Sequence, residues 1–188
     1  MGGGPSLKGL NVEALRGRKV IAVNSSFAAA PFADFLFFGD SRWWHLNSGA
    51  ALKRIASRVV TNSPTVRDPR VLLMRKTRPP PGIVDERDSL AMQYTSMQAA
   101  MNLAVHLGAA RLVLLGLDGQ PAPDGATHHH PPHPWPQRSN CWDMQAGSLR
   151  TTVKPLLKRG IDVVNANPGS AYSWWRKEPF AECLARYA

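Results

Sequence analysis

Short apolar runs, each followed by a polar or glycine residue, recur along the chain and determine its predicted fold. We interpret six of these runs as strands: 19–23, 34–40, 59–61, 71–74, 112–115 and 161–165. A short, continuous apolar run is typical of a strand that is buried on both faces of a parallel sheet. The pattern therefore predicts an α/β fold with a mostly parallel sheet.

Apolar residues at helical spacing lie between these runs. The segments predicted to be helical are 48–57, 96–107, 145–159 and 180–184. In the second segment Thr95 or Ser96 is a suitable N-cap, and Gly108 is a suitable residue to end the helix. Pro155 must kink the third helix or mark its start. The alternation of helix and strand is that of βαβ units.

Length and composition favour a single domain over 1–188. The chain has 188 residues, of which 44% are hydrophobic, enough for a substantial core. No apolar run approaches the ~20 residues that span a bilayer, and we find no charged-then-apolar leader. We therefore predict a cytoplasmic protein without a membrane partner. Cys141 and Cys183 are too few for a disulfide framework and are expected to be reduced thiols.

A formal charge of +10 favours polyanionic partners, either nucleotide phosphates or nucleic acid. One basic cluster flanks and enters a Pro-rich segment, 75–82, that we interpret as an extended surface loop. Its members are Arg67, Arg70, Arg75, Lys76 and Arg78. Trp43 and Trp44 follow Arg42 and either stack on a base or sugar or belong to the core.

Residues 119–142 form a His- and Pro-rich loop after the strand that ends at Gly116 and Asp118. Ligands of open α/β sheets bind at the carboxyl ends of strands, so we predict that this is the active-site loop. Its histidines have three interpretations: a metal site, a general acid or base, or a solvated loop. No Cys pair or HExxH helix accompanies them, so we expect no metal site. His106 is interpreted as structural.

Several short motifs resemble those of one family. Gly-x-Gly-Pro-Ser-Leu opens the chain at 2–7, Asn24 follows a strand, Thr95 precedes a helix, Gly116-x-Asp ends a strand, and Asn-Pro-Gly-Ser follows the last strand at 167–170. Their order is similar to that in the bacterial sialyltransferases of glycosyltransferase family 42. It also resembles the related archaeal 6-hydroxymethylpterin diphosphokinases and small phage proteins. The likeness covers nearly the whole chain and is greatest to the phage proteins.

The resemblance implies a Rossmann-like three-layer sandwich of the glycosyltransferase A type that uses a nucleotide-sugar donor. A CMP sugar is one candidate donor, and no other cofactor is expected. The implied nucleotide contacts are Gly2, Gly4, Pro5, Ser6, Asn24, Thr95, Ser96, Asp118 and Ser170. The implied general base is His128, His130 or His133. We favour His133, because a proline on each side would hold it rigidly.

The chain departs from the family at its start. The glycine loop should follow a buried strand, but only Met1 precedes Gly2. We therefore expect either a displaced start or a sheet that lacks its first strand and holds the loop weakly. Gly3 and Met97 also stand where the sialyltransferases have Asn and Gly, and the tyrosines that hold the CMP phosphate have no clear match.

Three functions follow from this reasoning. The leading prediction is a glycosyltransferase-like enzyme whose histidine loop supplies the general base. The first alternative is phosphoryl transfer that depends on a divalent metal, which Asp40 and Asp118 would help to hold. The second is a non-catalytic phage protein that binds nucleic acid through its basic surface.

Overall fold

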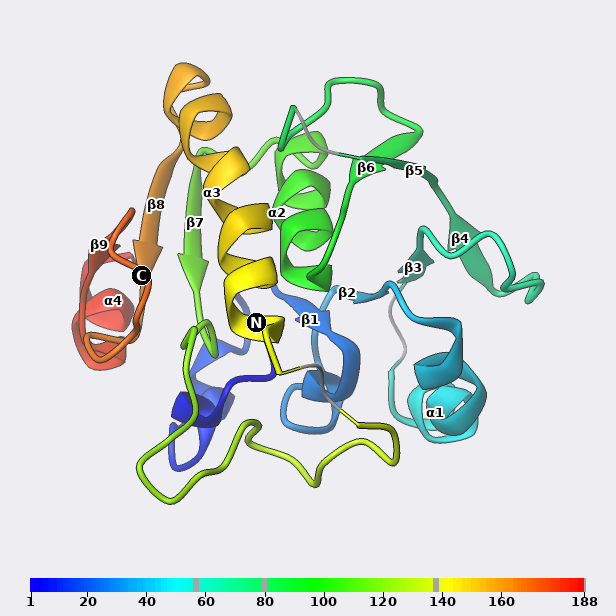
Figure 1. Ribbon diagram of the computed structural model, residues 1–188, viewed down its shortest axis with the longest axis horizontal. Helices are drawn as coiled ribbons and strands as arrows, with labels where there is room; N and C mark the ends of the chain where they lie inside the picture. Colours follow the sequence, from blue (N-terminus) through cyan, green and yellow to red (C-terminus); the bar gives the residue numbers. More distant parts are fainter. Residues whose placement is uncertain (56–57, 79–80, 137–138, 188) are drawn as a thin grey trace.

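The computed structural model describes residues 1–55, 58–78, 81–136 and 139–187 (Figure 1). The strands are β1 Ile21–Val23, β2 Phe35–Phe38, β3 Arg58–Thr61, β4 Val71–Leu73, β5 Arg75–Thr77, β6 Ser89–Ala91, β7 Arg111–Leu114, β8 Asp162–Asn165 and β9 Arg176–Lys177. The helices are α1 Ser41–Arg54, α2 Ser96–His106, α3 Cys141–Lys158 and α4 Phe180–Arg186. The 3-10 turns are η1 Pro5–Leu7, η2 Val12–Leu15 and η3 Asn24–Ala28.

The strands form parallel sheets, so the predicted α/β class with a mostly parallel sheet is confirmed. The strand order is β1-β2-β3-β4 in one sheet and β7-β8-β9 in a second, and β5 pairs with β6. These pairings are parallel; in the first sheet Leu36 lies between Ala22 and Val59. Six of the strands match predicted runs, whereas β5, β6 and β9 were not predicted.

Helices pack against both faces of β2. Along β2, Leu36 and Phe38 point into a core that includes Trp43 of α1, whereas Phe37 points into a core that includes Ala99 of α2. This alternation is the two-residue period of a strand. Figure 1 shows α2 and α3 side by side on one face, and Met101 and Leu149 share one core there.

The first residues of the chain lie between the two larger sheets. The Met1 amine donates to the Ile21 oxygen at 2.8 Å, and the Met1 oxygen accepts from the Val23 nitrogen at 3.0 Å. On the other side the Gly2 nitrogen donates to the Leu115 oxygen at 2.7 Å. Burial lowers the pKa of the Met1 amine to about 5. The expectation of a weakly held glycine loop is therefore wrong, since the loop bonds to both β1 and the end of β7.

Helix boundaries differ from the sequence predictions where a cap was overlooked. The helix α1 begins at Ser41, because the Asp40 carboxylate accepts from the Arg42 nitrogen at 2.9 Å. Trp43 and Trp44 therefore lie in a helix, 1% and 5% exposed, and belong to the core. The predicted end of this helix at 56–57 lies outside the described residues.

The other two long helices test the predicted caps and the effect of proline. The helix α3 starts four residues earlier than predicted and continues past Pro155. The predictions for α2 are confirmed: Thr95 caps the Met97 nitrogen at 3.2 Å, and Gly108 has a φ of 83°. His106 is structural as predicted, with Nε2 2.8 Å from the Ser89 oxygen.

The basic segment is more ordered and more neutralised than predicted. Residues Arg75–Thr77 form β5 rather than an extended loop, and Pro79 and Pro80 lie outside the described residues. The Arg75 guanidinium pairs with Asp88 at 2.9 Å, and Arg70 pairs with Asp68 at 2.8 Å. These carboxylates reduce the positive charge that the cluster offers to a polyanion.

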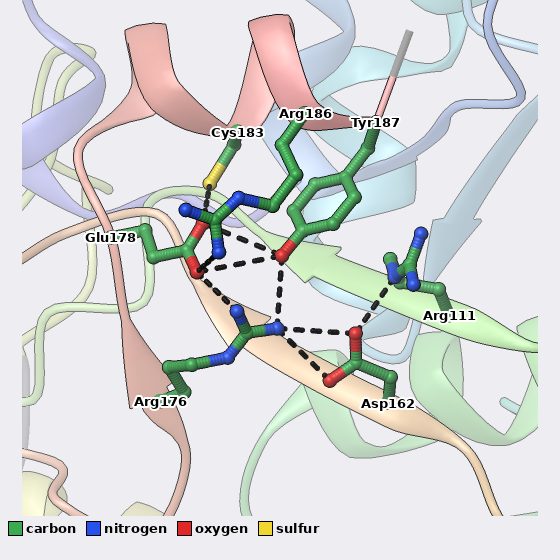
Figure 2. Close-up of polar contacts among 7 residues, drawn as sticks. All are labelled: Arg111, Asp162, Arg176, Glu178, Cys183, Arg186 and Tyr187. Atoms are coloured by element: carbon green, nitrogen blue, oxygen red, sulfur yellow. Dashed lines mark hydrogen bonds and ion pairs between the residues drawn. The ribbon is translucent and has the colours of Figure 1, made fainter.

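A charged network fixes α4 to the edge of the second sheet (Figure 2). At its centre the Glu178 side chain, 8% exposed, accepts from Arg176 and from Arg186 Nη1, the latter at 3.0 Å. Asp162 on β8 pairs with both Arg111 and Arg176, and these cations lower the pKa of its carboxyl group. The network ties β7, β8 and β9 to the C-terminal helix.

We expect Glu178→Gln to lower the free energy of unfolding by about 1–3 kcal/mol, because it leaves two guanidinium groups without their buried anion. Chemical denaturation measures the change. The matched control is Asp88→Asn, which breaks a pair whose side chains are both 68% exposed and should therefore lower the free energy of unfolding less than Glu178→Gln does. Equal losses in the two variants would contradict a structural role for the buried network.

Candidate functional site

A pocket of about 310 Å³ lies at the carboxyl ends of β1, β2 and β7. Nine of the twelve predicted site residues line it: Gly2, Gly4, Asn24, Thr95, Ser96, Asp118, His128, His130 and His133. Pro5, Ser6 and Ser170 are not among the lining residues. Figure 1 shows why distant segments meet here, since the strand ends, the start of α2 and α3, and the histidine loop lie on one side of the molecule.

The glycines at positions 2 and 4 are required by close contact with the end of β7. A Cβ atom at either position would lie 2.7 Å from the Gly116 oxygen, and at Gly4 it would also collide with the Asp118 carboxylate. The Gly4 nitrogen donates to the same Gly116 oxygen at 3.0 Å. A side chain at either position would therefore push the loop away from the strand end.

Asp118 holds the glycine loop in place. Its carboxylate accepts from the Ser6 nitrogen at 3.1 Å and from the Asn167 amide. Ser170 is buried and donates to the Leu117 oxygen at 2.8 Å. Ser6 and Ser170 thus hydrogen-bond to residues that line the pocket and do not line it themselves. That they and Pro5 contact a nucleotide stays a prediction.

Asn24 has the two features expected of a residue that is kept for binding. Its backbone φ is 51°, and among the described residues it is the one residue other than glycine with a positive φ. Its side-chain oxygen is buried and has no hydrogen-bond partner in the structure. A strained backbone and an unpaired buried acceptor both cost free energy and are concentrated at functional sites.

The starts of two helices lie at the pocket. Thr95 and Ser96 bring the start of α2 to the lining, and Trp142 and Gln145 bring the first turns of α3. The amide N–H groups at a helix start carry partial positive charge and point along the axis, so they favour phosphate. The contribution of α3 was missed, because the sequence predicted that this helix begins only at 145.

Tyr172 is a further lining residue that was not predicted from the sequence. Its hydroxyl group is buried without a partner, and burial raises its pKa to about 12. The ring lies against Gly119, where a Cβ atom would approach Tyr172 Cε1 to 2.8 Å. The only available signal was its position two residues after the Asn-Pro-Gly-Ser turn.

The histidine loop contributes three imidazoles to the pocket. The ring centroids of His128, His130 and His133 are 4.8, 5.4 and 5.2 Å apart, and His133 stacks on Trp135 at 4.9 Å. His129 points elsewhere, with Nε2 3.3 Å from the Ser26 hydroxyl. The backbone of the loop also contacts the glycine loop, because the His129 nitrogen donates to the Gly3 oxygen at 3.1 Å.

The contacts favour His130 over His133 as a proton acceptor. The Nδ1 atom of His130 is 2.7 Å from the Pro131 oxygen, so it carries the proton and leaves a lone pair on Nε2. Burial lowers the pKa of His130 and His133, and it lowers the pKa of His128 to about 4. Burial therefore favours the neutral form of these imidazoles, the form that a general base requires.

Comparison of the chain with models of protein families, with curated proteins and with solved structures found no match. Across the described residues, no helix combines the length and the apolar character needed to cross a bilayer.

Proposed function

We propose that the protein is a transferase that acts on a nucleotide-activated donor, resembling a glycosyltransferase on a Rossmann-like sandwich of the glycosyltransferase A type. The observation that supports it is the meeting of the glycine loop, Asn24, the start of α2 and three imidazoles around one pocket. Phosphate-binding groups and a proton acceptor are the two components that such a reaction needs.

In this proposal the donor phosphates lie against the glycine loop and the helix starts. Gly3 leaves the backbone accessible, because a Cβ atom there would approach nothing closer than 3.4 Å. The amide groups at the start of α2 and α3 stabilise the phosphate as it leaves. The unpaired Asn24 oxygen accepts a hydrogen bond from the base or the sugar of the donor.

The acceptor hydroxyl loses its proton to Nε2 of His130 as its oxygen bonds to the donor carbon. The bond between that carbon and the phosphate oxygen breaks, and the phosphate leaves with the electron pair. The Nε2 atom of His130 is 3.5 Å from the Cβ position of Gly3, so it lies next to the glycine loop against which the donor phosphates are proposed to lie.

The two alternatives have less support from the contacts. Asp40 pairs with Arg42 and caps α1, and Asp118 is occupied by Ser6 and Asn167, so neither carboxylate is well disposed toward a metal. In the basic cluster, Arg70 and Arg75 are paired with aspartates, which weakens the argument for nucleic acid.

A thermal-shift screen tests the proposal. We expect one nucleotide or nucleotide sugar to raise the melting temperature, because a ligand at about 100 times its Kd adds about 2.7 kcal/mol of stability. Inorganic phosphate at the same ionic strength is the control for simple anion binding. No shift with any nucleotide, together with DNA binding that weakens steeply with salt, would contradict the proposal and support the nucleic-acid alternative.

A further inference from the structure

We propose that His128, His130 and His133 form a binding site for one divalent transition-metal ion, with Zn²⁺ the best fit to a set of nitrogen ligands. This goes beyond the proposed function, in which the loop acts through a free imidazole. It also reverses the expectation from sequence that the loop holds no metal. The three histidines are two and three residues apart in the sequence, a spacing that resembles no common zinc motif. Their positions in space, not their spacing, indicate the site.

First, the three histidines are close enough together to share one metal ion. One ligand nitrogen from each histidine lies within 4.8 Å of the other two. Around a tetrahedral zinc ion with Zn–N distances of 2.0–2.1 Å, nitrogens lie roughly 3.4 Å apart and imidazole centres roughly 5 Å apart. The observed centroid separations of 4.8, 5.2 and 5.4 Å already match that arrangement. Modest ring rotations then suffice to bring the nitrogens together.

The second step is the orientation of the rings. Nδ1 of His130 is held by the Pro131 oxygen at 2.7 Å, and Nδ1 of His128 lies 2.9 Å from the Thr127 hydroxyl oxygen. Metal-bound histidines generally donate their second nitrogen to such an oxygen, which fixes the tautomer and the direction of the ring. Two of the three rings therefore have Nε2 available as the metal ligand.

The third step is access. The three histidines line the pocket, and Gly3, which lies next to His128 and His130, carries no side chain. The fourth position of the metal therefore faces the pocket, where water or a ligand oxygen can occupy it, as in open zinc sites. A coordinated imidazole has no lone pair for a proton, so in the metal-bound protein a metal-bound oxygen would be the group that loses its proton.

His129 provides a matched control within the same run of three histidines. Its Nε2 atom lies 3.3 Å from the Ser26 hydroxyl. Its ring centroid is 5.1 Å from that of His130, but it is not one of the three histidines whose ligand nitrogens lie within 4.8 Å of one another, so it should contribute nothing to a site defined by those nitrogens. A flexible polyhistidine segment would bind metal through any of its members. The comparison of His129 with its neighbours therefore separates a built site from an adventitious one.

The experiment is calorimetric titration of the metal-free full chain with Zn²⁺. We expect one ion per chain, a loss of at least about 100-fold in affinity in His130→Ala and in His133→Ala, and a loss of about 10-fold in Thr127→Val. His129→Ala should bind as the unaltered protein does. The melting temperature of each variant, measured without metal, shows whether it is folded.

Three results would overturn the proposal. They are no binding by the unaltered protein, an equal loss in His129→Ala and His130→Ala, and unchanged affinity in His130→Ala and His133→Ala. If a variant does not fold, the visible spectrum of Co²⁺ bound to the unaltered protein decides. Strong absorption typical of four-coordinate Co²⁺ supports the site, and the weak absorption of six-coordinate, water-bound Co²⁺ rejects it.

Discussion

Alanine at Gly4 is expected to destabilise the protein by about 3 kcal/mol, equivalent to roughly 6–12 °C in melting temperature for a chain of this size. The added Cβ atom would lie 2.7 Å from the Gly116 oxygen, a backbone atom at the end of β7 that cannot move independently. It would also displace the Asp118 carboxylate, which holds the Ser6 nitrogen. Thermal and chemical denaturation measure the change.

Gly3→Ala is the control in the same loop. Its nearest neighbours would be side-chain atoms of His128 and His130 at 3.4 and 3.5 Å, and its φ is not in the positive range that penalises alanine. We expect a change in stability within about 1 kcal/mol. If both variants lost the same stability, the close contact between the glycine loop and Gly116 would not be the cause.

Asn24→Gly is expected to weaken nucleotide binding at least about 10-fold, equivalent to 1.4 kcal/mol, with little change in stability. Glycine accepts the φ of 51° without strain, so the substitution removes the side-chain oxygen and keeps the backbone. The measurement is titration with the nucleotide that gives the largest thermal shift.

Asn24→Ala separates the two roles of this position. Alanine also lacks the side-chain oxygen but is strained at a positive φ, so it should bind as weakly as the glycine variant and be less stable by about 1 kcal/mol. Undiminished nucleotide affinity in Asn24→Gly would show that the unpaired oxygen serves no ligand. A large loss of stability in that variant would instead give Asn24 a structural role.

The strands of the core could be predicted because burial on both faces leaves a simple pattern. The runs that became β1, β2 and β7 each contain a continuous apolar stretch that is bounded by polar or glycine residues. The strands β5 and β6 could not be found in this way, since Arg75–Thr77 is exposed or half-buried and is stabilised by pairing with residues 14 positions away. Pairing over such a distance leaves no local signal.

Much of the pocket could be predicted for a related reason. Parallel strands present their carboxyl ends at one edge, so polar residues that follow separate strands, such as Asn24 and Asp118, meet there. Orientation was not predictable. Neighbouring histidines 128, 129 and 130 have similar local sequence, yet His129 turns toward Ser26 and the other two face the pocket. That difference is decided by contacts with the glycine loop.

Met1 and Gly2 connect the pocket to both of the larger sheets. Met1 hydrogen-bonds to β1, and Gly2 hydrogen-bonds to the peptide after β7. The glycine loop that follows is part of the pocket wall. A ligand that binds this loop would therefore also stabilise the hydrogen bonds that Met1 and Gly2 make to the two sheets. Ligand binding in the pocket and the stability of the junction between the two larger sheets are thereby thermodynamically linked, so a change in one changes the other.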